Sequence, residues 1–144
     1  MSEKLFSNEQ KSRIKEAIRE AEGNTSGEIR VHIDKKCKAD VLDRAAYIFE
    51  QLNMHKTKLR NGVLFYLAAD DHKFAILGDA GINTVVPDNF WDEIKDRMLN
   101  YFKEGQFTEG LEEGIRMAGQ QLKTQFPLQE DDVNELDDEI SFGE

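Results

Sequence analysis

The chain has 144 residues and a formal net charge of −10 at pH 7, and 39% of it is hydrophobic. This length fits one domain of ordinary size with a sizeable core. No apolar run reaches the roughly 18–20 residues that a membrane span needs. The single cysteine excludes an internal disulfide and a thiolate zinc site, and the acidic balance argues against nucleic acid as a partner.

The N-terminal residues Met1 to Leu5 contain no basic segment followed by an apolar one. The sequence therefore predicts no signal peptide. Together with the low cysteine content, this predicts a cytoplasmic protein, which we expect to be a monomer.

The first elements follow from capping residues and periodicity. Ser7 and Gln10 have the spacing of a capping box, which predicts the start of a helix that Gly23 is placed to end. Strict alternation of apolar and polar residues over 27–33 then predicts a strand toward a sheet edge. Asp40 can cap a second helix.

The middle of the chain predicts a hairpin. The continuous apolar run over residues 63–68 suggests a central strand that is covered on both faces. Residues 73–78 follow after a short turn and should pair with this strand in the antiparallel direction. Residues 84–86 either add a very short strand or remain a loop.

Two further helices complete the domain. Asp88 can cap the third helix and Gly105 can end it, and Phe107 opens the fourth. Gly110 and Gly114 lie one turn apart there, which lets this helix approach a neighbour closely despite their low helix propensity. The order α-β-α-β-β-α-α contains a βαβ unit and an antiparallel hairpin strand. It predicts an α/β fold, a three-layer α/β/α sandwich with a small mixed sheet.

The negative charge is concentrated at the C-terminus. Residues 129–144 contain eight acidic residues and no Lys or Arg, which leaves a net charge of −2 for residues 1–128. Because few apolar groups there offset repulsion and ordering entropy, we predict a folded domain over 1–128 and a disordered acidic tail over 129–144. The tail is either a solubilising segment or a short motif for a protein partner.

The predicted topology gathers polar residues at two ends of the sheet, and one end collects residues 25–28, 60–62 and 78–81. Carboxylate, amide and carbonyl oxygens are the ligands that Ca²⁺ and Mg²⁺ prefer. The candidate metal ligands at this end are Asp79, Glu28, Asn61, Ser26 and Asp88. Asn-Gly and Gly-Asp pairs are also common in ordinary turns, and their spacing alone favours that alternative.

The opposite end of the sheet gathers a second candidate metal site, made of Asp34, Asp70 and Asp71. Ligands of open parallel sheets bind beyond the carboxyl ends of the strands, which supports this site. Exposed aspartates in a hairpin turn are the more common explanation of the same pattern.

Other catalytic chemistry finds little support in the sequence. Cys37 lies among three lysines, which can activate a thiol, but a loop thiol at the surface is the simpler interpretation. His32, His55 and His72 lack metal-ligand spacing and are expected at the surface or half-buried. The sequence contains neither a phosphate-binding glycine loop nor a dinucleotide fingerprint.

Three segments, in this order and spacing, resemble the TPM domain family: residues 25–31 (TSGEIRV), 60–67 (RNGVLFYL) and 76–82 (ILGDAGI). The likeness extends over about residues 5–127, and its later part, from residue 86 to 127, is similar to a short bacterial branch of the family. It implies an α/β/α sandwich. Some members of the family are thylakoid-lumen proteins described as acid phosphatases, and others bind Ca²⁺ or Mg²⁺. The resemblance therefore implies phosphatase activity or divalent-cation binding as candidate functions.

Three functional hypotheses follow. The first is a TPM-like domain that binds Ca²⁺ or Mg²⁺ through loop carboxylates, without demonstrated catalysis. The second is a metal-dependent phosphatase, in which Arg60 balances the developing charge and Asp79 acts as metal ligand or nucleophile. The third is a protein-interaction module that uses the acidic tail over 129–144.

Overall fold

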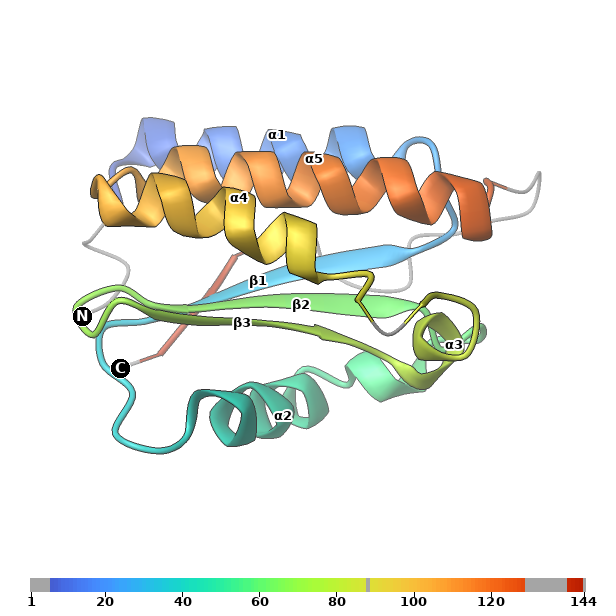
Figure 1. Ribbon diagram of the computed structural model, residues 1–144, viewed down its shortest axis with the longest axis horizontal. Coiled ribbons are helices and arrows are strands. Elements are labelled where there is room, and N and C mark those ends of the chain that lie inside the picture. Colours follow the sequence, from blue (N-terminus) through green and yellow to red (C-terminus); the bar gives the residue numbers. More distant parts are fainter. Residues whose placement is uncertain (1–5, 88, 129–139, 144) are drawn as a thin grey trace.

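The protein is an α/β/α sandwich, as predicted, in a computed structural model that describes residues 6–87, 89–128 and 140–143. The helices α1, α4 and α5 cover one face of the sheet and α2 covers the other (Figure 1). In chain order the elements are α1 (Asn8–Glu22), β1 (Glu28–Asp34), α2 (Val41–Gln51), the 3₁₀ helix η2 (Met54–Lys56), β2 (Gly62–Ala68), β3 (Lys73–Gly78), α3 (Ala80–Asn83), α4 (Asp92–Lys103), α5 (Phe107–Gln125) and β4 (Ser141–Phe142).

The sheet has the strand order β3-β2-β1-β4. β1 and β2 are parallel, with Glu28 opposite Gly62, and β2 and β3 form the predicted antiparallel hairpin, with Val63 opposite Gly78. The βαβ unit and the hairpin expected from the sequence are therefore both present. Their register brings the start of β1, the start of β2 and the end of β3 to one end of the sheet.

The predicted N-caps of α1 and α2 form where the sequence placed them. Ser7 and Gln10 make both hydrogen bonds of a capping box at the start of α1. The side chain of Asp40 accepts hydrogen bonds from two backbone N–H groups in the first turn of α2. These caps satisfy helix N–H groups that have no acceptor within the helix.

The structure differs from the prediction after β3. Asp79 caps the short helix α3, which the sequence did not indicate. Residues 84–86 form a turn, so the loop alternative is correct. The expected cap of the next helix, Asp88, lies outside the described residues, and α4 begins at Asp92 after Trp91.

The C-terminal segment also differs from the prediction. Residues 140–143 were expected to be part of a disordered tail, but Ser141 and Phe142 form β4 alongside the end of β1. Ile140 is 9% exposed and joins the main hydrophobic core. Burial of its apolar side chain stabilises the short strand in addition to its few backbone hydrogen bonds. The rest of the predicted tail, 129–139 and 144, lies outside the described residues.

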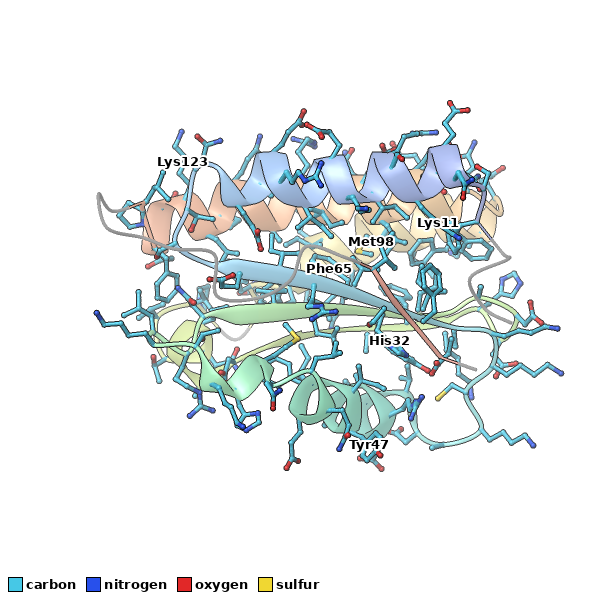
Figure 2. The ribbon with its side chains drawn as sticks, turned by 180° about the vertical axis from the view of Figure 1, so that it is seen from behind. Lys11, His32, Tyr47, Phe65, Met98 and Lys123 are labelled. Atoms are coloured by element: carbon cyan, nitrogen blue, oxygen red, sulfur yellow. The ribbon has the colours of Figure 1, made fainter. Side chains whose placement is uncertain are left out.

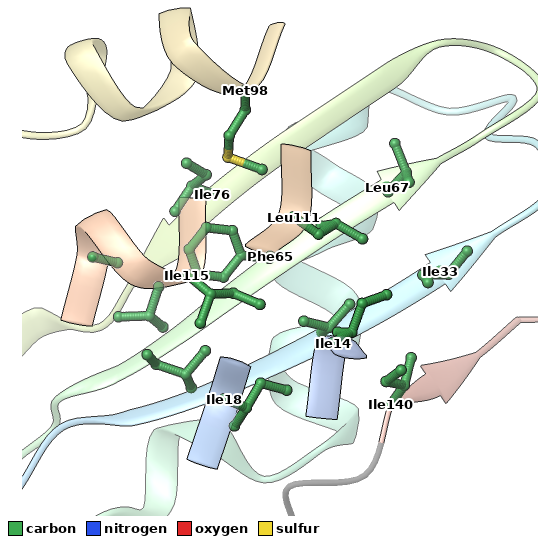
Figure 3. Close-up of a cluster of buried hydrophobic side chains, with 14 of the residues drawn as sticks. Ile14, Ile18, Ile33, Phe65, Leu67, Ile76, Met98, Leu111, Ile115 and Ile140 are labelled. Atoms are coloured by element: carbon green, nitrogen blue, oxygen red, sulfur yellow. The ribbon is translucent and has the colours of Figure 1, made fainter. Parts of the chain in front are cut away.

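Two hydrophobic clusters hold the layers together, one on each face of the sheet. The larger cluster lies between the sheet and helices α1, α4 and α5, with Phe65 of β2 among side chains such as Met98 and Ile115 (Figures 2 and 3). The smaller cluster lies between the sheet and α2 and includes Leu64 and Tyr66. Every residue of β2 is buried, which confirms the prediction of a central strand covered on both faces.

Close packing of α5 against α4 depends on its glycines. A Cβ atom on Gly110 would overlap the ring of Phe102 and would lie 3.2 Å from the Cβ of Tyr101, and one on Gly114 would overlap the side chain of Met98. The structure therefore confirms the packing role that the sequence predicted for Gly110 and Gly114.

Gly110→Ala should lower the free energy of unfolding by a net value of about 1 kcal/mol. Overpacking against the buried Phe102 costs about 1–3 kcal/mol, and the helix propensity of alanine offsets about 1 kcal/mol of it. Urea denaturation followed by circular dichroism measures the difference. Gly23→Ala is the matched control, because its Cβ would make only ordinary contacts at 3.4 and 3.5 Å. Stabilisation in both variants would contradict the prediction.

Candidate functional site

The three loops that the sequence placed at one end of the sheet do meet there. The side-chain Nδ2 of Asn61 donates to the carbonyl oxygen of Ser26 at 3.2 Å. The backbone N–H of Glu28 donates to the carbonyl of Asn61 at 3.2 Å, and that of Asp79 donates to the carbonyl of Gly62 at 2.9 Å. The strand directions predicted from the sequence thus bring these loops to one end, and the observed register aligns them.

Asp79 is held in place by Arg60 and by the start of α3. Nε and Nη2 of Arg60 donate to the two carboxylate oxygens at 2.7 and 2.8 Å, and the N–H of Ala80 donates to Oδ1 at 2.7 Å. The hydrogen bond and the charge of Asp79 raise the pKa of Arg60 above its ordinary value. The carboxylate is buried, but the Arg60 side chain is 50% exposed. Asp79 therefore has a partner that water can reach.

Arg60 adopts a left-handed backbone conformation, with φ of 52°. Residues other than glycine rarely adopt this region, and such strain is often found at functional sites. The conformation brings the Arg60 carbonyl to the N–H of Gly81, at 2.8 Å. It links the loop before β2 to the loop after β3.

Asn61 has an oxygen atom without a protein partner. The residue is 1% exposed, and its Oδ1 is buried with no hydrogen-bond donor among the described residues. An unpaired buried polar atom costs about 1–3 kcal/mol relative to a paired one. The position of Asn61 Oδ1 is the feature at this end that is best suited to contact a ligand.

Glu28 and Asp79 lie on opposite sides of β2. Glu28 is paired with Gly62, and Gly62 is hydrogen-bonded to Asp79. Neighbouring strands are about 4.8 Å apart, so the two acidic residues are separated by about 10 Å at the backbone. Met54 packs over Gly62, where an added Cβ would lie 3.2 Å from the Met54 carbonyl oxygen. The backbone thus holds the two leading candidate ligands two strands apart.

No cluster of three or more His, Cys, Asp or Glu side chains within residues 6–87, 89–128 and 140–143 has a geometry that could hold a metal ion. At the first end, Asn61 is hydrogen-bonded to Ser26 and to the backbone N–H of Glu28, whereas Asp79 lies on the other side of β2 with Arg60 as its partner. The fifth candidate, Asp88, lies outside the described residues.

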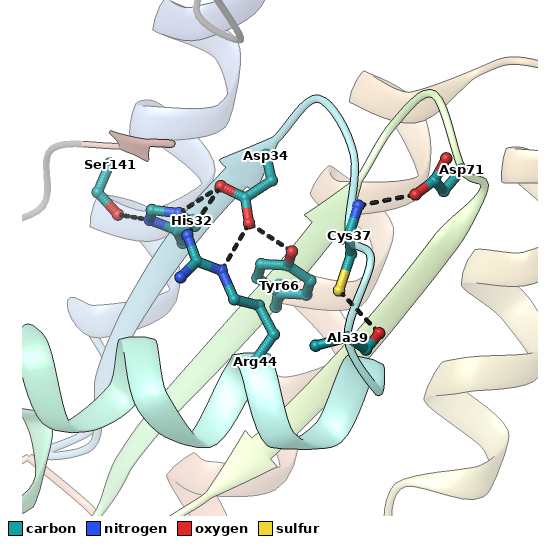
Figure 4. Close-up of polar contacts among 8 residues, drawn as sticks. All are labelled: His32, Asp34, Cys37, Ala39, Arg44, Tyr66, Asp71 and Ser141. Carbon is teal, nitrogen blue, oxygen red and sulfur yellow. Dashed lines mark hydrogen bonds and ion pairs between the residues drawn. The ribbon is translucent and has the colours of Figure 1, made fainter. Parts of the chain in front are cut away.

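The opposite end of the sheet contains a buried polar network, which we call the Asp34 cluster (Figure 4). It consists of His32, Asp34, Arg44, Tyr66 and Ser141. Asp34 accepts hydrogen bonds from Arg44 Nε at 2.9 Å and from the Tyr66 hydroxyl, and its Oδ1 lies 3.0 Å from His32 Nε2. The other ring nitrogen of His32, Nδ1, lies 2.7 Å from Ser141 Oγ.

The Asp34 cluster shifts two pKa values in opposite directions. Burial alone would raise the pKa of Asp34, but hydrogen bonds from His32, Arg44 and Tyr66 outweigh burial and hold this pKa well below its usual range. Burial and the hydrogen bond to Asp34 both raise the pKa of Tyr66 far above that of an exposed tyrosine. At neutral pH the cluster therefore contains an ionised carboxylate and a neutral phenol.

The three aspartates of the second candidate site have different environments. Asp34 is buried in its cluster, Asp71 accepts a hydrogen bond from the backbone N–H of Cys37 at 2.7 Å, and Asp70 is exposed. Their backbones are close, because the N–H of Asp70 donates to the carbonyl of Lys35 at 2.8 Å. Since Asp34 already binds protein donors, this end is better described as a structural network.

Two predictions about burial were wrong. His32 is 5% exposed, because β4 covers the edge of β1 beside it, and Cys37 is also buried, with its Sγ donating to the carbonyl of Ala39. One signal pointed toward the Asp34 cluster: Tyr66 interrupts an apolar central strand, and a buried tyrosine hydroxyl usually has a partner. Its position opposite His32 follows from the register of β1 and β2.

Comparison with protein families and solved structures agrees with this fold. The model of the TPM domain family matches residues 1–121. The NMR structure of the BA42 protein from the psychrophilic bacterium Bizionia argentinensis is 49% identical, with a TM-score of 0.91, over 96% of this chain and 95% of that one. The chain belongs to the TPM domain family.

Two more distant structures share the fold. The N-terminal domain of a protein from P. gingivalis is 25% identical with a TM-score of 0.69, over 85% of this chain and 79% of that one. The N-terminal domain of cg2496 from Corynebacterium glutamicum is 13% identical with a TM-score of 0.65, over 81% and 73%. No curated protein matches the chain. None of the helices in its described part combines the length and apolar character needed to cross a membrane.

Proposed function

We propose that this TPM domain binds a divalent cation, Ca²⁺ or Mg²⁺, at the end of the sheet where the loops that carry Ser26, Asn61 and Asp79 meet. We call these three residues the Asn61 site. The observation that carries the proposal is the buried Oδ1 of Asn61, which has no donor among the described residues. Amide, carboxylate and backbone carbonyl oxygens are the ligand types that a hard cation prefers, and all three occur at this end of the sheet.

Arg60 competes with the cation for the carboxylate of Asp79. Its guanidinium occupies both oxygens of Asp79, and its half-exposed side chain can turn into water without leaving a buried charge of its own. A cation that reaches Asp79 replaces this ion pair. Glu28 lies on the Ser26 side of this end, where its backbone N–H donates to the Asn61 carbonyl, and it adds negative charge there.

The affinity should be low. With one carboxylate and otherwise neutral oxygens, the site resembles the weak end of protein Ca²⁺ sites, with dissociation constants of about 10⁻⁴–10⁻³ M. NMR titration with CaCl₂ and with MgCl₂ tests the proposal residue by residue. Saturable shifts in residues 25–28, 60–62 and 78–82 are expected. Shifts confined to residues 34 and 70–72, or no shifts, would contradict this site.

Arg60→Gln should tighten cation binding about tenfold, because it removes a positive charge that competes for Asp79. Asp79→Asn should abolish binding while it keeps a residue that can cap α3. Arg13→Gln is the matched control, since Arg13 also pairs with a carboxylate, that of Glu112, but on the helical layer. Equal affinities of wild type, Arg60→Gln and Asp79→Asn would contradict the role of the pair.

A metal-dependent phosphatase is the second candidate function, and one observation favours it. The exposed guanidinium of Arg60 lies directly beside the proposed cation site, and arginine binds phosphoryl oxygens well. Hydrolysis of an aryl phosphate with and without Mg²⁺ tests this activity. Mg²⁺-dependent turnover that disappears in Asp79→Ala supports it, whereas turnover that is unchanged in this variant excludes the site as its source.

A further inference from the structure

The C-terminal residues of the described chain lie against the edge of β1 as an added strand. Ser141 is opposite His32 and Phe142 is opposite Ile33 in a parallel pairing, and the N–H of Gly143 donates to the carbonyl of Ile33 at 2.9 Å. This pairing is short and uses only the carboxyl-terminal part of β1. The segment is therefore held as much by its side chains as by its backbone.

The side chains of residues 140 and 142 are directed to the helical face of the sheet. Ile140 enters the main core beside Ile14 and Ile33 (Figure 3). Phe142 packs against the same core, and Lys11 Nζ of α1 lies 5.4 Å from the centre of its ring. The segment thus presents two apolar anchors to a groove that is flanked by a positive charge.

Residues 141 and 143 lie against His32 and Asp34 on the other face. Ser141 Oγ lies 2.7 Å from His32 Nδ1 and donates to the carbonyl of Val31 at 3.3 Å. A Cβ on Gly143 would overlap Asp34 Oδ1 and would lie 2.8 Å from Asp34 Cγ. Position 143 therefore accepts only glycine unless the segment or Asp34 moves.

From these four contacts we infer that the edge of β1 is a recognition site for an extended peptide with the pattern apolar, serine, aromatic, glycine. Its resident occupant is the chain's own segment 140–143, which acts as a detachable strap. Strand addition to a sheet edge is an established mode of peptide recognition, in which backbone hydrogen bonds give affinity and alternate side chains give specificity.

The charge pattern supports the chain's own tail as the occupant. Seven of the eleven residues over 129–139 are acidic, and Lys11 and Lys15 of α1 line the surface pocket that contains Ile140 and Phe142. A covalent tether of this length gives the strap an effective concentration of about millimolar, so it outcompetes a free peptide of equal affinity at lower concentrations. Release of the strap would uncover the β1 edge and His32.

The test uses the full-length chain and a synthetic peptide of residues 137–143. In Gly143→Ala the added Cβ should detach the strap, which would appear as shifted NMR signals and faster amide exchange at residues 31–34 and 141–143. The free peptide should then bind this variant with saturable shifts along β1 and at Lys11, and about tenfold more tightly than it binds the wild type. A peptide with alanine in place of its glycine should not bind.

One control variant and one milder variant complete the test. Gly23→Ala carries the same substitution far from β4 with only ordinary contacts, and it should leave the strap in place. Ser141→Ala removes only the contacts of the hydroxyl and should weaken the strap without the overlap at Asp34. Unchanged signals in Gly143→Ala, or equal peptide affinity for wild type and variant, would overturn the inference. A wild-type dimer formed through β1 would also overturn it, because the occupant would then be a second copy.

Discussion

Asp34→Ala is expected to lower the free energy of unfolding by about 3 kcal/mol or more, the usual cost of removing one partner from a buried ion pair. Asp34 accepts hydrogen bonds from Arg44 and Tyr66 and contacts His32. Arg44 is partly exposed and can turn to water, but Tyr66 and His32 are buried and would keep unpaired polar atoms. The variant therefore loses more than the attraction between two charges.

Urea denaturation of wild type and Asp34→Ala measures this loss. Asp70→Ala is the matched control, because Asp70 follows the neighbouring strand but is exposed, and its replacement should change stability by no more than about 0.5 kcal/mol. Similar small effects of the two substitutions would show that the Asp34 cluster contributes little to the fold.

The pKa shifts in the cluster predict how this contribution depends on pH. Because the pKa of Asp34 is lowered in the folded state, the unfolded chain takes up a proton first, near its ordinary value of about 3.9. The stabilisation by Asp34 is fully present above that pH and is lost as the pH falls toward the folded-state value. The stability difference between wild type and Asp34→Ala should therefore shrink below about pH 4.

The raised pKa of Tyr66 has the opposite consequence. The phenol of the unfolded chain ionises near its ordinary value of about 10, whereas that of the folded chain stays neutral. The contribution of Tyr66 is thus fully present below about pH 10 and is lost as the pH rises toward the folded-state value. In Tyr66→Phe, the free energy of unfolding should no longer fall for this reason above about pH 10. The same decrease of the free energy of unfolding with pH in wild type and Tyr66→Phe would contradict the assignment to Tyr66.

Gly81→Ala should also be strongly destabilising, by about 3 kcal/mol. A Cβ on Gly81 would overlap the carbonyl oxygen of Leu59 and would lie 2.6 Å from that of Arg60. These are backbone atoms that cannot rotate away, so the loop before β2 must move as a unit. The helix propensity that alanine adds to α3, about 1 kcal/mol, does not offset the overlap.

The same substitution should disturb the Asn61 site, because the displaced loop carries Arg60 and Asn61. We expect large NMR shifts at residues 60–62 and 78–80 together with the loss of stability. Gly23→Ala again provides the control, since it adds the same methyl group where contacts are ordinary. A stable Gly81→Ala variant with unchanged signals in the loop before β2 would contradict this account.

Much of the candidate site could be predicted from the sequence, because its assembly depends on strand direction. The alternation in β1, the apolar run of β2 and the short turn before β3 define a βαβ unit and a hairpin, and these bring the loops that carry Ser26, Asn61 and Asp79 to one end of the sheet. The pairing of Asp79 with Arg60 could not be predicted in the same way. Arg60 also adopts a left-handed backbone conformation, which no neighbouring residue type predicts.

Local patterns predicted the four longer helices, the N-caps of α1 and α2 and the three longer strands, since these depend on residues within a few positions of one another. The burial of His32 and the docking of residues 140–143 depend on contacts between positions more than 100 residues apart, such as His32 with Ser141. An acidic composition predicts repulsion along the tail, but it contains no information about a groove with room for Ile140. That information lies in the packed surfaces of β1 and α1, which exist only once the chain has folded.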